Sequence, residues 1–416
     1  MKKSKFAVIT QLDKDNNIIY STLTRQYVVY DKEMNINELL ENLNKEEYSI
    51  SEIDLLKKLI KSGIVCKSEQ NEIEALKKKT QLYNKKQFMI TIFVTNACNF
   101  RCIYCTQEHK TKVINEEVLE GIINFIEKNC YIYDEICISW FGGEPLLQYD
   151  KICNTMNQLL YCCKESKCKI YGVITSNGYL LDKNRIGNLA NNNIKMMQIT
   201  IDGDETFHNS TRKLCDGSGT YYQIMENVIN CLKGGIQIIL RINLQEGIEQ
   251  TIVDTLKKIP AELRHLVKIS IGNVFQNQKY ISTYNYYKVA IDLGYRYFGR
   301  YNSFSGCSVI GKNRLTINTN GDVVICTNCE KEKRLGYLTV SGDLIIEEQE
   351  RRKKVYEANA LENDTCIDCI MLPFCFGDCN YKRMKNNSKC LGNHADGMSL
   401  IEKIKLDYYY DKVLGN

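Results

Sequence analysis

Three closely spaced cysteines constrain this sequence more than any other feature. Cys98, Cys102 and Cys105 follow the pattern C-x3-C-x2-C, directly after the apolar stretch 89–94. Such a stretch reads as a buried strand, so the cysteines fall on the loop that leaves it. Three thiolates on one short loop can bind three irons of a [4Fe–4S] cluster and leave the fourth iron open to a ligand. The alternative is a zinc loop, in which His109 supplies the fourth ligand.

The length of 416 residues predicts two or three domains, and the pattern along the chain divides it into segments 1–85, 86–300 and 301–416. Segment 1–85 combines short β-rich runs with an amphipathic helix, for which Ser51 is expected as N-cap and Gly63 as the stop. We expect a small winged-helix-like module there.

Segment 86–300 alternates strands and helices, which predicts an α/β fold with a parallel sheet and right-handed crossovers. The expected strands are 89–95, 135–141, 169–175, 197–201, 236–243 and 267–271. The expected helices between them are 116–128, 149–163, 182–190, 221–232 and 252–258. In such folds the active site lies at the carboxyl ends of the strands, and the cysteine triad follows the first of them.

Further motifs follow the second and third strands. The run Trp140-Phe141-Gly142-Gly143-Glu144-Pro145 places two glycines, a carboxylate and a proline after the second strand. Glycine lets the backbone approach a ligand closely, and proline fixes the turn. Ser176 and Asn177, in Thr175-Ser176-Asn177-Gly178, follow the third strand and can bond sugar hydroxyls.

Charged residues follow the fourth and fifth strands. Asp202 ends the fourth strand and Arg212 comes soon after it, while Arg241 lies at the end of the fifth. An arginine can bind a carboxylate by two parallel hydrogen bonds, or it can form an internal ion pair. Asp202, Arg212 and Arg241 are therefore candidate site residues without a fixed role, and no general base is predicted.

The triad, together with the GGEP run, resembles the radical S-adenosylmethionine (SAM) enzymes. The resemblance implies a partial (β/α)6 barrel in which SAM chelates the open iron and a reduced cluster cleaves it to a 5′-deoxyadenosyl radical. It also implies that Gly142, Gly143, Glu144 and Pro145 bind the SAM amino group, and that Ser176 and Asn177 bind the ribose. An electron donor such as flavodoxin or ferredoxin is a further implied partner.

The last segment carries a second cysteine pattern, which is similar to the SPASM domain of radical SAM peptide-modifying enzymes. Its members are Cys307, Cys326, Cys366, Cys369, Cys375, Cys379 and Cys390. The resemblance implies one auxiliary [4Fe–4S] cluster on Cys366, Cys369, Cys375 and Cys390, and another on Cys307, Cys326 and Cys379. Asn313 stands where many relatives have a further cysteine. In the second set the fourth ligand is therefore Cys329, or the fourth iron has no protein ligand. Zinc is the alternative metal.

Together these features predict a peptide maturase with three [4Fe–4S] clusters and SAM. Segment 1–85 resembles a module that binds the leader of a precursor peptide, although it could also be a stabilising cap. The expected product is a cysteine thioether. The alternatives are a sulfatase-maturing enzyme that makes formylglycine, a carbon–carbon crosslinking maturase, and a non-catalytic zinc- or cluster-bearing adaptor.

Composition limits the remaining possibilities. The chain has 20 cysteines but no signal-peptide pattern and no apolar stretch long enough to span a membrane, so we expect reduced thiols in the cytoplasm. Its net charge of +5 is too small to indicate nucleic-acid binding.

Overall fold

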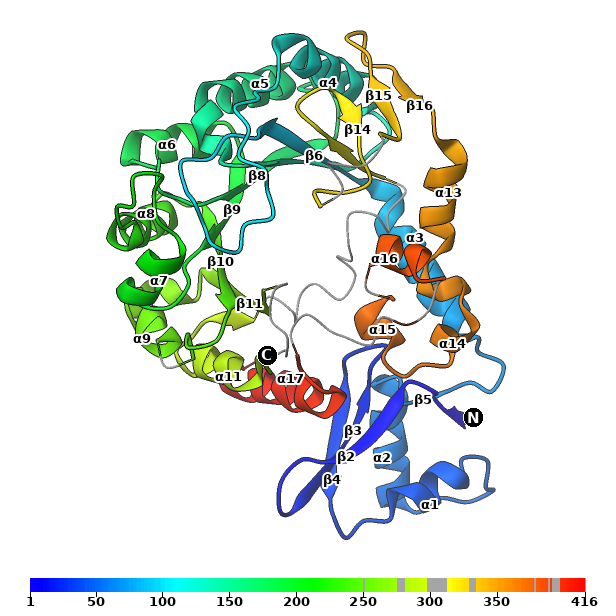
Figure 1. Cartoon of the computed structure of the whole chain (residues 1–416). Coiled ribbons are helices and arrows are strands. Elements are labelled where there is room, and N and C mark those ends of the chain that lie inside the picture. The colour runs from blue at the N-terminus through cyan, green and yellow to red at the C-terminus, as the bar shows by residue number, and fades with distance from the viewer. Residues whose placement is uncertain are drawn as a thin grey trace.

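One large β-sheet organises most of the chain. The computed structural model describes residues 1–249, 251–274, 281–297, 313–328, 334–377, 379–387, 390 and 397–415. Within these residues the sheet has eleven strands, in the order β12-β11-β10-β9-β8-β7-β6-β13-β14-β15-β16, and it curves around the centre of Figure 1. The predicted α/β fold with a mainly parallel sheet is confirmed.

Six successive strands form the parallel centre of this sheet. They are β6 (Gln87–Thr95), β7 (Glu135–Gly142), β8 (Lys169–Ser176), β9 (Ile194–Thr200), β10 (Gln237–Leu244) and β11 (Val267–Asn273). A parallel pair requires a crossover, and at least one helix separates each strand from the next. The helices are α4 (Glu116–Asn129), α5 (Tyr149–Cys162), α6 (Lys183–Asn191), α7 (Glu205–Thr211), α8 (Tyr221–Lys233), α9 (Ile252–Lys257) and α10 (Ala261–Arg264), and the short 3-10 turn η1 (Pro145–Gln148) precedes α5.

These elements form because their apolar residues match the period of each structure. In β6, Ile90, Ile92 and Val94 are all buried, as expected for a strand covered on both faces. In α4, the buried residues include Leu119 and Ile122, at helical spacing. Figure 1 shows the helices on the outer side of the curved sheet, so its inner side is left for other parts of the chain.

Strands at both edges extend the parallel centre, one from the end of the second predicted segment and the others from the third. After α11 (Tyr284–Asp292), β12 (Arg296–Tyr297) joins one edge of the sheet. At the other edge β13 (Arg314–Ile317) pairs in parallel with β6, and β14 (Asp322–Val323), β15 (Gly336–Leu338) and β16 (Leu344–Ile346) follow as antiparallel strands. The third segment therefore contributes buried apolar strands as well as cysteines.

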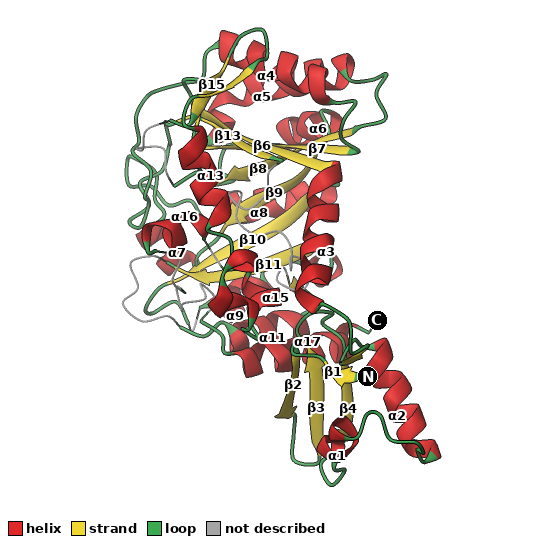
Figure 2. Cartoon of the chain, turned by 90° about the vertical axis from the view of Figure 1, so that its right-hand side faces the viewer, coloured by secondary structure: helices red, strands yellow, loops and turns green. Residues whose placement is uncertain are grey.

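A separate antiparallel sheet forms near the N-terminus. It contains β2 (Ala7–Gln11), β3 (Asn16–Ser21) and β4 (Tyr27–Asp31), in that order. The short strands β1 (Lys2–Lys3) and β5 (Val65–Cys66) pair beside it, and α1 (Ile36–Glu41) and α2 (Ile50–Lys61) pack against it. The helix α3 (Glu72–Lys86) then leads into β6. Figure 2 shows this sheet below the large one, close to α17 (Leu400–Leu414).

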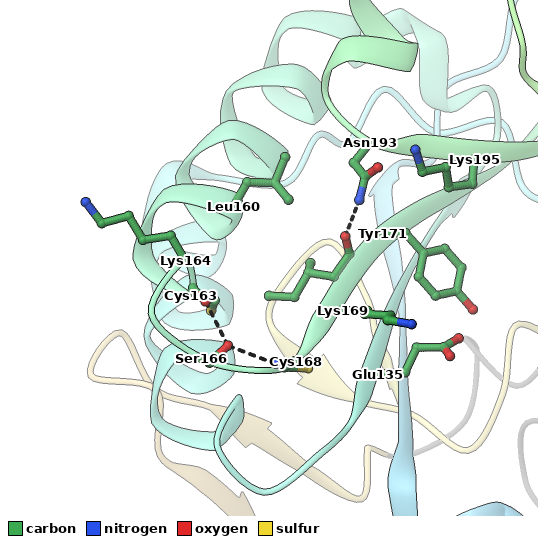
Figure 3. Close-up of a pocket in the computed structure, with 11 residues that line it drawn as sticks. Glu135, Leu160, Cys163, Lys164, Ser166, Cys168, Lys169, Tyr171, Asn193 and Lys195 are labelled. Carbon is green, nitrogen blue, oxygen red and sulfur yellow. Dashed lines mark hydrogen bonds between the residues drawn. The ribbon is translucent and has the colours of Figure 1, made fainter.

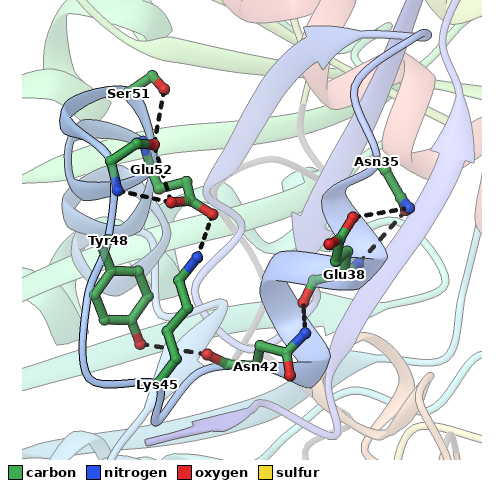
Figure 4. A network of polar contacts seen from close by, with 8 residues as sticks. Asn35, Glu38, Asn42, Lys45, Tyr48, Ser51 and Glu52 are labelled. Carbon is green, nitrogen blue, oxygen red and sulfur yellow. Dashed lines mark hydrogen bonds and ion pairs between the residues drawn. The ribbon is translucent and has the colours of Figure 1, made fainter.

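The helix α2 starts two residues earlier than the sequence predicted. Its N-cap is Ser49, whose side chain accepts a hydrogen bond from the Glu52 amide while the Glu52 carboxylate accepts one from Ser49. Figure 4 shows this pair and the ion pair of Glu52 with Lys45, at 2.6 Å. A reciprocal capping box needs Glu or Gln three residues after the cap, and Ser51 has the shorter Asp54 there. The expectation that Ser51 caps the helix was wrong for this reason.

Further helices follow in the C-terminal part of the chain, and α15 and α17 among them pack against the N-terminal sheet. They are α13 (Gln349–Glu357), the 3-10 turn η2 (Ala360–Glu362), α14 (Asp364–Ile367), α15 (Leu372–Cys375), α16 (Asn380–Lys385) and α17. Tyr20 of β3 donates a hydrogen bond to Asp407 of α17, and Ile18 packs on Ile404. Among the described residues, no helix has both the length and the apolar character needed to cross a membrane.

Candidate active site

The loop that carries Cys98, Cys102 and Cys105 is fixed at the carboxyl end of β6. It pairs with the segment after α7, because the amide of Arg101 donates to the Lys213 carbonyl at 2.9 Å. Further along, the amide of Ile103 donates to the Thr211 carbonyl at 3.1 Å. The loop therefore has a defined course, and the three thiols lie at the edge where the parallel strands end.

The three thiols differ in their surroundings. Cys98 and Cys102 are half-buried and Cys105 is exposed. Burial raises the pKa of the Cys98 thiol to about 12, although a hydrogen bond from the Phe100 amide to its sulfur, at 3.4 Å, acts the other way. Iron binds thiolates, so binding here must release protons. Across the described ranges, no three Cys, His, Asp or Glu side chains are already arranged as ligands of a metal ion.

The two glycines after β7 pack against the backbone that leads to Cys98. A Cβ on Gly142 would lie 2.1 Å from the Thr95 carbonyl oxygen, and one on Gly143 would lie 2.2 Å from the Ala97 oxygen. The Gly143 amide donates to Thr95 at 2.9 Å, and the next amide donates to Ala97 at 2.8 Å. Gly142 also has a φ of 137°, which glycine adopts most readily. Only glycine fits this close approach of the two loops.

Glu144 joins the ends of two neighbouring strands. Its carboxylate is fully buried and accepts hydrogen bonds from the Leu146 amide at 3.0 Å, the Ser176 hydroxyl at 2.8 Å and the Asn177 amide at 2.7 Å. Burial raises the pKa of this carboxyl, and its hydrogen-bond donors oppose that change. The Asn177 side chain in turn donates to Asn99, beside the triad, at 2.8 Å. Glu144 thus holds together the predicted amino-group and ribose segments.

A tyrosine that the sequence reasoning missed connects the triad loop to the next strands. The Tyr104 hydroxyl donates to Asp202, and it accepts hydrogen bonds from Arg212 at 2.6 Å and from the Asn243 side chain at 3.1 Å. The other Asp202 oxygen accepts from the Asn243 amide at 2.8 Å. A hydroxyl-bearing aromatic residue between two cysteines was the available signal for this role.

The charges in this network balance one another. Burial raises the pKa of Asp202, and Arg212 counteracts it. Burial alone would lower the pKa of Arg212. Tyr104, Cys102 and Asp202 have the opposite and larger effect, so the pKa of Arg212 is raised. Burial also lowers the pKa of His208 well below its ordinary range, so this ring is neutral and accepts the Asp202 amide at 3.2 Å. Arg212 is therefore a buried cation with a resident counterion.

Arg241 is placed differently. Its Nε donates to the Asn243 side chain at 2.9 Å and its Nη1 to the Ser270 hydroxyl at 3.3 Å. A Cβ on Gly272 would lie only 2.8 Å from its Nη2, so glycine leaves room for the guanidinium. Both acceptors are neutral, and Arg241 is half-buried. Arg241 therefore donates to neutral acceptors, although its charge, like that of Arg212, also acts on Asp202.

The C-terminal cysteines gather on the turns between short helices. Cys366 lies in α14, Cys369 follows it, and Cys375 ends α15. Burial raises the pKa of Cys375, and the charges of Cys369, Cys366 and Cys390 raise it further, while a hydrogen bond from the Gly377 amide opposes the change. The Gly377 amide donates to the Cys375 sulfur at 3.3 Å.

The other predicted auxiliary set is described only in part. Cys326 is buried shortly after β14, and Cys379 is the N-cap of α16, where its sulfur accepts a hydrogen bond from the Lys382 amide at 3.5 Å. Cys307 and Cys329 lie outside the described residues. The amide-to-sulfur bonds at Cys98, Cys375 and Cys379 suit thiolate ligands, which are strong acceptors.

A pocket of about 520 Å³ lies away from these motifs. It is lined by residues that include Glu135, Cys163, Cys168, Lys169 and Asn193, and Figure 3 shows them around the start of β8. Because Glu135 and Lys169 begin their strands, this pocket lies at the amino ends of the sheet. It is opposite to the edge that carries the triad.

The fold and the site together define an α/β domain with a cysteine triad at the carboxyl edge of its parallel sheet. Residues 92–259 match the family model described as the Radical SAM superfamily. This part of the chain, which begins inside β6 and ends two residues after α9, is similar to the radical SAM superfamily.

Known proteins resemble the chain over different spans. A GTP 3′,8-cyclase of Clostridium perfringens is 24% identical over 46% of this chain and 58% of its own length. A cysteine-type anaerobic sulfatase-maturating enzyme of the same species is 27% identical over 31% of this chain and 36% of its own. This chain therefore spans less than two thirds of each relative.

Solved structures share the fold over more of the chain. The structure of anSMEcpe with bound AdoMet and Cp18Cys peptide is 16% identical and has a TM-score of 0.56, covering 78% of this chain and 97% of that one. The structure of Streptococcus suis SuiB bound to S-adenosylmethionine is 15% identical and has a TM-score of 0.50, with coverage of 92% and 97%.

Proposed function

We propose that this protein is a radical SAM peptide maturase that forms a cysteine thioether in a ribosomally made precursor. The observation that carries the proposal is the fixed loop of Cys98, Cys102 and Cys105, which packs on Gly142 and Gly143 at the carboxyl edge of the sheet. The bound AdoMet and peptide in the anSMEcpe structure, and the bound S-adenosylmethionine in SuiB, support this reading.

The residues at this edge suit a SAM site next to the cluster loop. The main chain at Gly142 and Gly143 would take the amino group, with Pro145 fixing the turn, and Glu144 would position Ser176 and Asn177 toward the ribose. Arg241 would bind the carboxylate, because Arg212 is already paired with Asp202 through Tyr104. When bound, the cluster and SAM supply one-electron cleavage of SAM and hydrogen-atom abstraction from the substrate.

Two auxiliary [4Fe–4S] clusters complete the proposal. Cys366, Cys369, Cys375 and Cys390 would hold one of them, and the hydrogen bonds donated to the sulfurs of Cys366 and Cys375 support this set. Cys307, Cys326 and Cys379 would hold the other, with Cys329 or the sulfur of a substrate at the fourth position. The reductant would be a flavodoxin or ferredoxin, and the setting the cytoplasm.

The N-terminal sheet would bind the leader of the precursor. Its strands lie in the order β2-β3-β4, so β2 and β4 are its edges. An extended peptide can add to such an edge through main-chain hydrogen bonds. Peptide recognition would then lie within the segment 1–85.

The second candidate is a sulfatase-maturing activity that oxidises Cys or Ser to formylglycine. The match to a cysteine-type anaerobic sulfatase-maturating enzyme, and the shared fold of anSMEcpe, favour it. A carbon–carbon crosslink is a variant of the main proposal.

Mass spectrometry separates these activities. The enzyme and a short cysteine-bearing peptide encoded beside it would be combined anaerobically, and free thiols would then be alkylated. Loss of two hydrogens with one cysteine protected supports the thioether, whereas the same loss with all cysteines alkylated indicates a carbon–carbon link. The variant with Cys98→Ala, Cys102→Ala and Cys105→Ala must be inactive, and turnover by it would refute radical SAM chemistry.

A further inference from the structure

A completely buried arginine lies among the C-terminal cysteines. Arg383, on α16, has no exposed surface. Its Nε donates to the Ala358 carbonyl at 3.0 Å, and its Nη1 donates to the Cys366 sulfur at 3.3 Å. A Cβ on Gly377 would lie 3.2 Å from its Cδ and Nε, so glycine leaves space for this side chain. The fold thus makes room for a guanidinium beside a cysteine.

The charge of Arg383 lacks a counterion among the described residues. Its two hydrogen bonds go to a carbonyl and a sulfur, and its Nη2 has no acceptor there. Arginine does not lose its proton in proteins, and a buried charge without an anion is strongly unfavourable. Asn380, on the same helix, is also fully buried, and neither atom of its amide has a partner in the described part of the chain. The Nη2 of Arg383 and the amide nitrogen of Asn380 are thus two buried donors without an acceptor in the described part of the chain, and the charge of Arg383 indicates a buried anion beside it.

We propose that Arg383 is the countercharge and sulfur hydrogen-bond donor of the auxiliary centre on Cys366, Cys369, Cys375 and Cys390. This inference rests on the ligand set of the proposed function. Four thiolates around a [4Fe–4S]²⁺ core carry a net charge of −2, and one-electron reduction makes it −3. A fixed positive charge stabilises the reduced form more than the oxidised form. Arg383 consequently raises the reduction potential, because charge and sulfur hydrogen bonds both set it.

The test uses the full chain with Cys98→Ala, Cys102→Ala and Cys105→Ala, so that only auxiliary centres contribute. Arg383→Met removes the charge, Arg383→Lys retains it, and Arg264→Met is the matched control. Arg264 donates to the carbonyls of Ile259, Leu293 and Lys257, and its guanidinium lies over the Tyr295 ring. Iron content and the reduction potential would be measured in a dithionite titration followed by electron paramagnetic resonance.

We expect Arg383→Met to reduce the equilibrium constant for reduction at least tenfold. For a one-electron couple, this corresponds to a reduction potential that is at least 59 mV lower. Arg383→Lys retains the charge, so its reduction potential should fall by less than half as much. Arg264→Met should not change the potential. If Arg383→Met loses iron while Arg383→Lys keeps it, the charge is again supported. An unchanged potential in Arg383→Met, or equal iron loss in both variants, would overturn the inference.

The proposed ligand set has its own control. Cys369→Ala in the same background must remove one cluster from the iron count and one signal from the spectrum. If it removes neither, these cysteines do not bind a cluster and the ligand set is wrong. If it removes both but the potential of Arg383→Met is unchanged, the ligand set is right and only the role of Arg383 is refuted.

Discussion

The contact between Gly143 and the triad loop gives the sharpest prediction. In Gly143→Ala the new Cβ would lie 2.2 Å from the Ala97 oxygen and 2.8 Å from the Asn96 oxygen, both in the main chain. Ordinary contact needs about 3.4 Å, so the loop must retreat by about 1.2 Å. That shift breaks the hydrogen bond from Gly143 to Thr95 and the one from Glu144 to Ala97, which together contribute about 2 kcal/mol.

A misplacement of about 1 Å can lower a rate about 100-fold, and we expect a loss of this size in reductive SAM cleavage. The assay is anaerobic release of 5′-deoxyadenosine with dithionite, alongside iron content and thermal unfolding. Gly187→Ala is the control, because nothing lies within 4 Å of its Cβ and it sits inside α6. It should keep the rate and gain roughly 0.5–1 kcal/mol of stability. A folded Gly143→Ala protein with the wild-type rate would refute the reasoning.

Two further predictions concern Tyr104 and Glu52. Tyr104→Phe leaves Asp202 and Arg212 without their shared hydroxyl, and hydrogen bonds to charged groups contribute about 1.5–3 kcal/mol each. We expect a stability loss of roughly 3 kcal/mol and slower SAM cleavage, and thermal unfolding with the same assay would check both; a melt identical to the wild type contradicts the network. The Glu52 pKa is lowered from 4.5 to about 2, first by its hydrogen bond with Lys45 and then by the cap at Ser49. The ionised Glu52 carboxylate stabilises α2 above pH 4.5, and this stabilisation is lost as the pH falls toward 2. Amide hydrogen exchange in α2 should therefore accelerate between these pH values. The Glu52→Gln variant should show no such change.

The sequence predicted the parallel core well because each strand there is rich in apolar residues, and predicted helices lie between the strands. All six expected strands exist, and their ends carry the expected motifs. The pairing of β13 with β6 was not predicted, since Arg314–Ile317 is short and its partner is more than 200 residues away. Local pattern contains no information on such a distant pairing.

Side-chain roles were harder to predict than positions. Glu144 was expected to help bind the SAM amino group, which stays a prediction, and the sequence did not indicate that its carboxylate accepts hydrogen bonds from Leu146, Ser176 and Asn177. Tyr104 was overlooked because its partners come from three separate loops and strands. Spacing predicts which residues share an edge of the sheet, whereas hydrogen-bond partners depend on the three-dimensional packing of that edge.

The attachment of the N-terminal sheet to the C-terminal cysteine turns limits how the enzyme can be dissected. Lys5 donates to the Ile367 carbonyl at 2.6 Å, and Thr22 donates to the Ile370 carbonyl at 2.9 Å. Phe6 packs in one cluster with Cys366. Deleting residues 1–85 would therefore expose the apolar side of the turn that carries Cys366, as well as remove the segment proposed to bind the leader. Inactivity of a truncated protein would not show that the leader is required, because the C-terminal turns would be disturbed as well. Point substitutions on the outer edge of the sheet test leader binding without this disturbance.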